Sequence, residues 1–174
     1  MSERTDKGLI QVYTGDGKGK TTAALGLAMR AAGQGMRVGF IQFLKGETSG
    51  EHLFLSRYHA FDIIQIGTGS GFTKSWEQLS GEAQRTLDYV EDQIMNGGYD
   101  MVIMDEIFVA IQKGLITTKQ VLELLDKRPS SVELVLTGRY APPEVVERAD
   151  LVTEMHMIKH PFNQGVAARR GIEY

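Results

Sequence analysis

Residues 13–23 read Tyr-Thr-Gly-Asp-Gly-Lys-Gly-Lys-Thr-Thr-Ala, and the apolar residues Leu9, Ile10 and Val12 come directly before them. This order of a short strand, a glycine-rich turn and an Ala/Leu-rich helix beginning near Lys20 is typical of a phosphate-binding loop. Backbone N–H groups of such a turn and the positive end of the helix dipole point at the same anion. The alternative is a flexible turn between a strand and a helix, which does not require this order.

Individual residues of the loop have separate expected roles. Lys20 is placed to reach the outer phosphates of a nucleotide, and the Thr21 hydroxyl to reach its Mg²⁺. Three residues separate Gly15 from Gly19, one fewer than in the GxxxxGK[ST] pattern, so the nucleotide is expected to sit differently from that of an ordinary NTPase. The nucleotide-binding residues predicted in this loop are Gly15, Asp16, Gly17, Lys18, Gly19, Lys20, Thr21 and Thr22.

The chain of 174 residues has no cysteine and a formal net charge of −3. Its length suits one domain, residues 1–174, with a core that needs no covalent staple. The lack of cysteine excludes disulfides and thiolate metal sites and fits a reducing compartment, so a cytoplasmic location is expected. The acidic balance argues against a nucleic-acid partner, and no apolar run has the length of a membrane span.

Apolar runs recur along the chain with helical or glycine-rich stretches between them, which is the pattern of a mostly parallel sheet with helices on both faces, an α/β fold. Gly33, Gly35 and Gly97 are helix stop signals, and Pro142 is a start signal. The predicted strands are residues 9–13, 37–43, 61–66, 100–104, 132–137 and 151–155. The predicted helices are residues 20–34, 50–58, 78–96, 118–126 and 142–148.

The segment Tyr99-Asp-Met-Val-Ile-Met-Asp-Glu106 has the form of a Walker B strand, which delivers carboxylates to the sheet edge beside the phosphate loop. Mg²⁺ needs only one or two carboxylates in addition to phosphate oxygens. If both carboxylates were still in the strand, Asp105 and Glu106 would point in opposite directions, so one is expected to hold the metal or its water. The alternative is a strand exit followed by Asp-Glu as a helix N-cap.

Other candidate residues come from loops. Arg139 follows the strand of residues 132–137 and is expected to contact phosphate, with an ordinary surface arginine as the alternative. Arg30 would bind the nucleotide only if the nucleotide lay across the first helix. Phe72 and Trp76 lie in a Gly/Ser-rich loop, where they either bind a ligand or anchor the loop to the core. The tail from Lys159 either packs on the domain or caps a bound anion.

Six segments of the sequence together match the motifs of a known family. They are Thr14-Gly-Asp-Gly-Lys-Gly-Lys-Thr-Thr-Ala-Ala24, Val38-Gly-Phe-Ile-Gln-Phe-Leu-Lys-Gly46, Gly71-Phe-Thr73, Met104-Asp-Glu106, Leu136-Thr-Gly-Arg139 and the tail from Lys159-His160 to Gly171-Ile-Glu-Tyr174. Together they resemble the P-loop type of the ATP:corrinoid adenosyltransferases of cobalamin biosynthesis and salvage. The resemblance runs from about residue 8 to residue 174. It implies a RecA-like P-loop fold, usually as a homodimer.

The resemblance also implies the reaction and its participants. A cob(I) corrinoid would attack the 5′ carbon of ATP, whose triphosphate leaves as one unit. ATP would lie in the phosphate loop in the reverse orientation, with its outer phosphate where an NTPase holds an inner one. Lys20 and Thr21 would bind phosphate, and Thr21 with Glu106 would hold Mg²⁺. Phe72 matches the aromatic residue that lies against the lower face of the corrinoid. An electron-donating reductase is an implied partner.

The chain departs from the family in two places. The second corrinoid-facing aromatic usually comes two residues after the first, where this chain has Lys74, and Trp76 takes that role only if the loop is longer by two residues. About seven residues precede the first strand, so the N-terminal helix that often covers the partner's site is not expected here. A P-loop ATPase or small-molecule kinase is the rival function, and a nucleotide-sensing module without chemistry is a second. The preferred corrinoid and the reductase are not encoded in any motif found.

Overall fold

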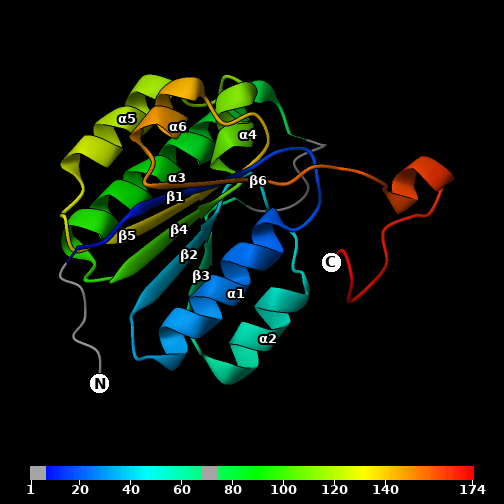
Figure 1. Cartoon of the computed structure of the whole chain (residues 1–174), viewed down its shortest axis with the longest axis horizontal. Helices are drawn as coiled ribbons and strands as arrows, with labels where there is room; N and C mark the ends of the chain where they lie inside the picture. Colours follow the sequence, from blue (N-terminus) through cyan, green and yellow to red (C-terminus); the bar gives the residue numbers. More distant parts are fainter. Residues whose placement is uncertain (1–6, 68–73) are drawn as a thin grey trace.

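The structure is a computed structural model that describes residues 7–67 and 74–174. Its centre is a six-stranded sheet in which every pair of neighbouring strands is parallel (Figure 1). The strands, in the order β3-β2-β4-β5-β1-β6 across the sheet, confirm the six predicted from the sequence. They are β1 (Ile10–Thr14), β2 (Val38–Gln42), β3 (Asp62–Gln65), β4 (Met101–Asp105), β5 (Glu133–Thr137) and β6 (Leu151–Glu154).

Helices connect the strands, and all five predicted helices are present, within about two residues of their predicted ends. The structure adds a short helix directly after β4 and a 3₁₀ turn in the tail, neither of which was predicted. The helices are α1 (Lys20–Gly33), α2 (Gly50–Tyr58), α3 (Trp76–Asn96), α4 (Ile107–Gln112), α5 (Thr118–Lys127) and α6 (Pro143–Arg148), and the 3₁₀ turn is η1 (Pro161–Gln164).

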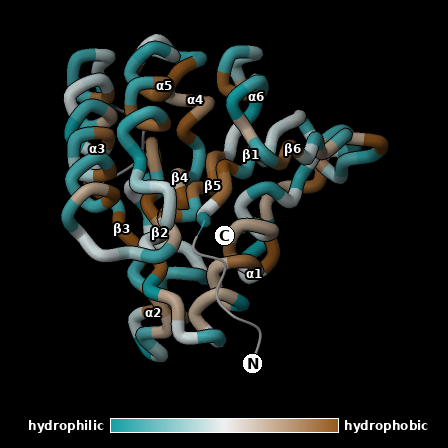
Figure 2. Tube along the Cα trace, turned by 60° about the vertical axis from the view of Figure 1, so that its left-hand side comes forward, coloured by the Kyte–Doolittle hydropathy of each residue, from teal (hydrophilic) through white to brown (hydrophobic). Residues whose placement is uncertain are grey.

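Both faces of the sheet are covered. Helices α1 and α2 lie on one face, and α3, α4, α5 and α6 on the other (Figure 1). Along β4, Met101 and Ile103 pack toward α1, whereas Val102 and Met104 pack toward the other layer. Because successive side chains of a strand point to opposite faces, a strand covered on both sides is apolar throughout, and the central strands are accordingly brown in Figure 2.

Strand order brings chemically different residues to one edge. β5 lies between β1 and β4, with Tyr13 paired to Thr137 and Met104 paired to Leu136. On the far side of β4, Asp105 pairs with Gln42 of β2. Since all strands are parallel, their carboxyl ends share one edge of the sheet, where ligands bind in folds of this kind.

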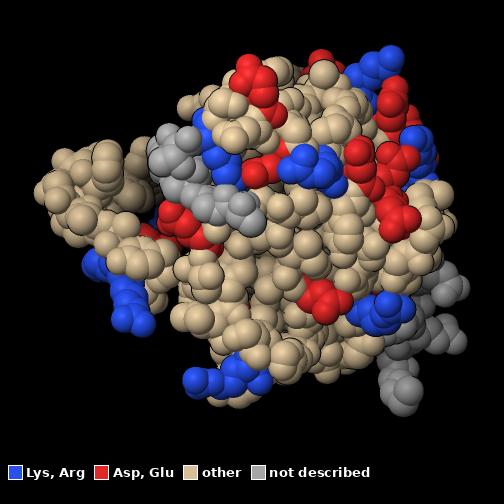
Figure 3. All heavy atoms as spheres, turned by 180° about the vertical axis from the view of Figure 1, so that it is seen from behind, with Lys and Arg blue, Asp and Glu red and all other residues tan. Residues whose placement is uncertain are grey.

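β6 is an edge strand whose four residues are all exposed. After it, the arm (residues 157–168, including η1) projects from the body of the molecule, as Figures 1 and 3 show from opposite sides. Elsewhere on the face in Figure 3, basic and acidic side chains are interspersed. Within residues 7–67 and 74–174, no helix is both long and apolar enough to span a bilayer.

Candidate functional site

A cavity of about 500 Å³ lies at the carboxyl edge of the sheet. The phosphate loop and the start of α1 line it, together with residues 171–174 of the tail. Seven of the eight loop residues predicted to bind nucleotide line it. The lining residues are Asp16, Gly17, Lys18, Gly19, Lys20, Thr21, Thr22, Leu25, Lys45, Gly50, Glu51, Glu106, Arg139, His160, Gly171, Ile172, Glu173 and Tyr174.

The phosphate loop wraps around the side chain of Lys20. The Lys20 ammonium group is buried and donates hydrogen bonds to the carbonyl oxygens of Gly15 at 2.8 Å and Gly17 at 2.7 Å. Burial lowers the pKa of Lys20, although the nearby Glu106 carboxylate opposes that shift. Lys20 thus holds the loop in shape at the floor of the cavity. A phosphate group bound there would have the positive charge of Lys20 beside it.

The segment after β6 supports the loop from behind, which the sequence did not reveal. Met155 accepts from the Gly17 N–H at 2.7 Å, and its own N–H donates to the Thr14 carbonyl at 2.9 Å. A Cβ atom at Gly15 or Gly17 would lie 2.4 or 2.7 Å from the Met155 carbonyl oxygen. These glycines are therefore required for close approach of the Met155 backbone, in addition to their expected role toward phosphate.

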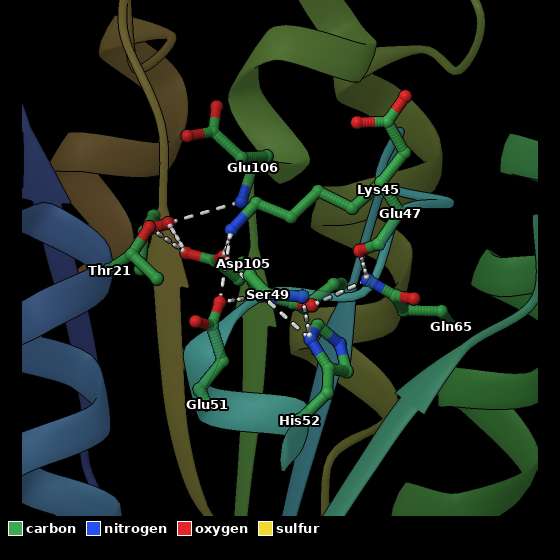
Figure 4. Close-up of polar contacts among 11 residues, drawn as sticks. Thr21, Lys45, Glu47, Ser49, Glu51, His52, Gln65, Asp105 and Glu106 are labelled. Atoms are coloured by element: carbon green, nitrogen blue, oxygen red, sulfur yellow. Dashed lines mark hydrogen bonds and ion pairs between the residues drawn. The ribbon is translucent and has the colours of Figure 1, made fainter. Parts of the chain in front are cut away.

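Asp105, at the end of β4, is fully buried and surrounded by donors (Figure 4). Its Oδ1 accepts from the hydroxyls of Thr21 at 2.9 Å and Thr137 at 2.7 Å. Its Oδ2 accepts from Gln42 Nε2 at 3.2 Å and Lys45 Nζ at 3.4 Å. With both oxygens engaged by protein donors, Asp105 acts by orienting the Thr21 hydroxyl toward the cavity.

Glu106 leaves the strand altogether. Its φ of 64° is in the left-handed region, which turns its side chain into the cavity and away from Asp105 (Figure 4). Glu106 occupies the N-cap position of α4, as the alternative reading of the sequence expected. Its side chain makes no capping hydrogen bond there, however. Burial, followed by the charge of Asp105, raises the pKa of Glu106. A strained, desolvated carboxylate facing a cavity is a typical functional residue.

Three cations have different positions relative to the cavity. Arg139 lines it from the turn after β5, as expected from the sequence. Lys45 also lines it, between Asp105 at 3.4 Å and Glu51 at 3.7 Å, and was not singled out from the sequence although it follows β2 just as Arg139 follows β5. Arg30 is exposed in the last turn of α1, about 15 Å along the helix from Lys20, and is absent from the described lining of the cavity.

Of the two predicted aromatic residues, the structure describes Trp76, which is absent from the described lining of this cavity. Phe72 lies outside the described residues. Trp76 is the first residue of α3 and its side chain is 58% exposed, so it does not anchor the loop in the core. The helix is instead started by Ser75, whose hydroxyl accepts from the Gln78 N–H in a capping box.

The donors around Thr21 fit Mg²⁺. The described residues contain no group of three or more His, Cys, Asp or Glu side chains arranged around one point, which excludes an all-protein cage among them. They do bring together, at the phosphate loop, the Thr21 hydroxyl, the Asp105 carboxylate that orients it and the inward-facing Glu106. Mg²⁺ is commonly held by one or two carboxylates, a hydroxyl and substrate phosphates, which is the set available here.

Comparison with known proteins places this chain in a family. Residues 6–174 match the model described as ATP:corrinoid adenosyltransferase BtuR/CobO/CobP. A corrinoid adenosyltransferase from Pseudomonas aeruginosa is 35% identical over 98% of this chain and 86% of its own length. One from Sinorhizobium is 38% identical over 100% and 84%, and one from Escherichia coli K12 is 34% identical over 97% and 87%.

Solved structures show the same fold at low sequence identity. A KaiC-like protein from Pyrococcus horikoshii superposes with a TM-score of 0.60 at 17% identity, covering 88% of this chain and 75% of the other. The RadB recombinase superposes with a TM-score of 0.52 at 14% identity, covering 90% and 78%. The expected RecA-like α/β fold is therefore confirmed.

Proposed function

Because the chain belongs to the ATP:corrinoid adenosyltransferase family and is thus a corrinoid adenosyltransferase, we propose which residues perform the transfer and how. The phosphate loop and the Asp105–Glu106 pair, brought to one cavity, carry this proposal. ATP is the proposed donor and a reduced corrinoid the acceptor.

In the proposed step, the electron pair of Co(I) attacks the 5′ carbon of ATP. A cobalt–carbon bond forms, the bond from C5′ to the first phosphate oxygen breaks, and inorganic triphosphate leaves with that bond's electrons. Co(I) has no proton to lose, so the protein needs no base to activate it. The protein's task is to align the two reactants and to stabilise the charge that develops on the triphosphate.

The residues around the phosphate loop suit that task. Lys20, Lys18 and Arg139 bring positive charge to the cavity. The loop from Gly15 to Gly19 would surround the triphosphate, and all of its residues but Gly15 line the cavity. Thr21 and Glu106 are the proposed Mg²⁺ ligands, with Asp105 orienting the Thr21 hydroxyl at 2.9 Å. When bound, Mg²⁺ supplies positive charge to the phosphate oxygens.

The acceptor side of the site is proposed from the family resemblance. Phe72 would lie against the lower face of the corrinoid and displace its axial ligand, so that cobalt becomes four-coordinate and easier to reduce. The exposed side chain of Trp76 supports a contact with a ligand over a packing role. A reductase supplies the electron, and a cytoplasmic location with its reducing environment belongs to the same proposal.

A homodimer is also proposed, with residues 1–174 as one domain in each copy. A single sheet joins β1 to β6, which supports one domain. The edge strand β6 and the arm expose apolar side chains, among them Val152, Ile158 at 91% and Phe162 at 75%, which supports burial against a second copy. Light scattering after gel filtration tests the mass of the assembly.

The identity of the phosphorus product tests the function. ATP, Mg²⁺ and a chemically reduced corrinoid are combined without air, and the products are followed by phosphorus NMR. Inorganic triphosphate formed only when corrinoid is present is the expected result. ADP and phosphate formed without corrinoid would instead identify an ATPase, the rival function, and phosphorylation of a small acceptor would identify a kinase.

A further inference from the structure

Residues 169–174, which we call the hook, form a compact turn at the end of the arm. The Arg169 N–H donates to Glu173 Oε2 at 2.7 Å, and the Glu173 N–H donates to the Arg169 carbonyl at 2.9 Å. Gly171 N–H donates to the Tyr174 carbonyl at 2.7 Å. The hook therefore keeps its shape through its own hydrogen bonds.

The Lys18 side chain attaches the hook to the phosphate loop. Lys18 Nζ donates to Glu173 Oε1 at 2.8 Å and to the Ile172 carbonyl at 3.3 Å. The Lys18 and Glu173 side chains are 45% and 23% exposed, so the ion pair is accessible to water and ions. Both residues also line the cavity, which places the Glu173 carboxylate on a cation of the proposed triphosphate site.

A carboxylate in this place opposes the binding of phosphate. Hydrogen bonds from Arg169 and Lys18 lower the pKa of Glu173 to about 2, so the carboxylate is charged at neutral pH. Like charges repel at short range, and a triphosphate at Lys18 would face this carboxylate directly. We propose, on the basis of the proposed function, that Glu173 competes with the phosphate groups of ATP and of released triphosphate for Lys18, and so sets the affinity of the site for polyphosphate.

Breaking the ion pair does not leave Glu173 without a positive partner. Arg169 also donates to Glu173 from Nη2 at 3.0 Å and from Nε at 3.3 Å. The hook can therefore move off Lys18 with its own turn intact when polyphosphate enters. When triphosphate is released, Glu173 takes back Lys18 and hinders rebinding of the product.

Calorimetric titration with inorganic triphosphate and Mg²⁺ measures the competition. Glu173→Gln should bind triphosphate about two- to fivefold more tightly than the wild type, as expected for an exposed ion pair, and the difference should shrink at high salt. The control is Glu91→Gln, which removes the carboxylate partner of Lys127 in another exposed ion pair that is absent from the described lining of the cavity, and it should bind as the wild type does. Equal or weaker binding by Glu173→Gln would overturn the proposal.

Limited trypsin digestion tests the movement of the hook in the unmodified chain. Inorganic triphosphate should accelerate cleavage after Arg169 and Arg170 relative to other sites in the same digest, since the hook leaves Lys18. Slower or unchanged cleavage would mean that the hook stays on the loop and would overturn the proposal. If the wild type binds no triphosphate at all, the proposed nucleotide site itself fails; if it binds but Glu173→Gln is without effect, only the competition fails.

Discussion

The backbone N–H of Gly17 donates to the carbonyl oxygen of Met155 at 2.7 Å, although the two residues lie near opposite ends of the chain. The bond ties the phosphate loop to the segment that follows β6. One amide of a loop that is already one residue short thereby has a protein acceptor. The loop's shape consequently depends on a strand that local sequence does not connect with it.

Gly17→Ala should damage both stability and ATP binding. The added Cβ would lie 2.7 Å from the Met155 carbonyl oxygen, a backbone atom that cannot rotate away. We expect a loss of about 1–3 kcal/mol in the free energy of unfolding, measured by urea denaturation, and weaker ATP binding. Gly26→Ala is the control, because a Cβ there meets nothing within 4 Å. Because Gly26 lies in an exposed helix interior, Gly26→Ala should raise the free energy of unfolding by about 0.5–1 kcal/mol and leave ATP binding intact.

Lys20→Ala should abolish productive use of ATP with the fold preserved. It removes the buried cation from the phosphate site and frees the carbonyls of Gly15 and Gly17. Turnover should fall by about a hundredfold or more, while circular dichroism keeps the wild-type spectrum. Near wild-type turnover with an unchanged ATP requirement would refute the assignment of this loop.

The two neighbouring carboxylates should respond differently to loss of charge. Glu106→Gln should raise the Mg²⁺ concentration that gives half-maximal activity, since it removes a proposed ligand. Asp105→Asn should mainly lower stability, because Asp105 accepts from Thr21, Thr137, Gln42 and Lys45 and an amide cannot accept at both atoms. Altered Mg²⁺ dependence at Asp105 but not at Glu106 would reverse the metal assignment.

Glu106→Gln should also stabilise the protein in a pH-dependent way. Burial raises the pKa of Glu106 above its ordinary value of 4.5, so the folded state retains the proton to higher pH than the unfolded state. The partly buried Glu106 carboxylate therefore lowers the free energy of unfolding once it is ionised. This loss of stability is absent below pH 4.5 and develops as pH rises through the raised pKa. At pH 7.5 the variant should melt higher than the wild type, by about 2–4 °C for each 1 kcal/mol recovered. At pH 4 the difference should vanish; a gain independent of pH would point to another cause.

Phe72→Ala should lower activity far more with a cob(II) substrate that is reduced on the enzyme than with cob(I) supplied chemically. Only the first substrate needs its lower axial ligand displaced, and spectroscopy of four-coordinate cob(II) follows that step. Trp76→Ala should have a smaller effect in the same assay. Equal losses with both substrates at Phe72 would indicate a packing role.

The sequence alone predicted the strands, most helices and the phosphate loop, because each depends on short-range features. A run such as Met101 to Met104 is apolar enough to identify a strand covered on both faces. Helix α4 was missed because Ile107 to Ile111 continues the apolar run of β4 with no polar alternation, and Glu106 starts it without a side-chain cap.

Only the tertiary structure decided which residues meet. Thr21 and Asp105 are 84 residues apart, and their contact depends on the order in which the strands pair. The same order brings Met155 behind the phosphate loop and Lys45 to Asp105, and leaves Arg30 at the far end of α1. Hydrophobic periodicity encodes which face of a strand is buried, but not which strand lies beside it. The family could therefore be predicted from local motifs. The contacts that support the phosphate loop and the charges around it could be identified only from the folded chain.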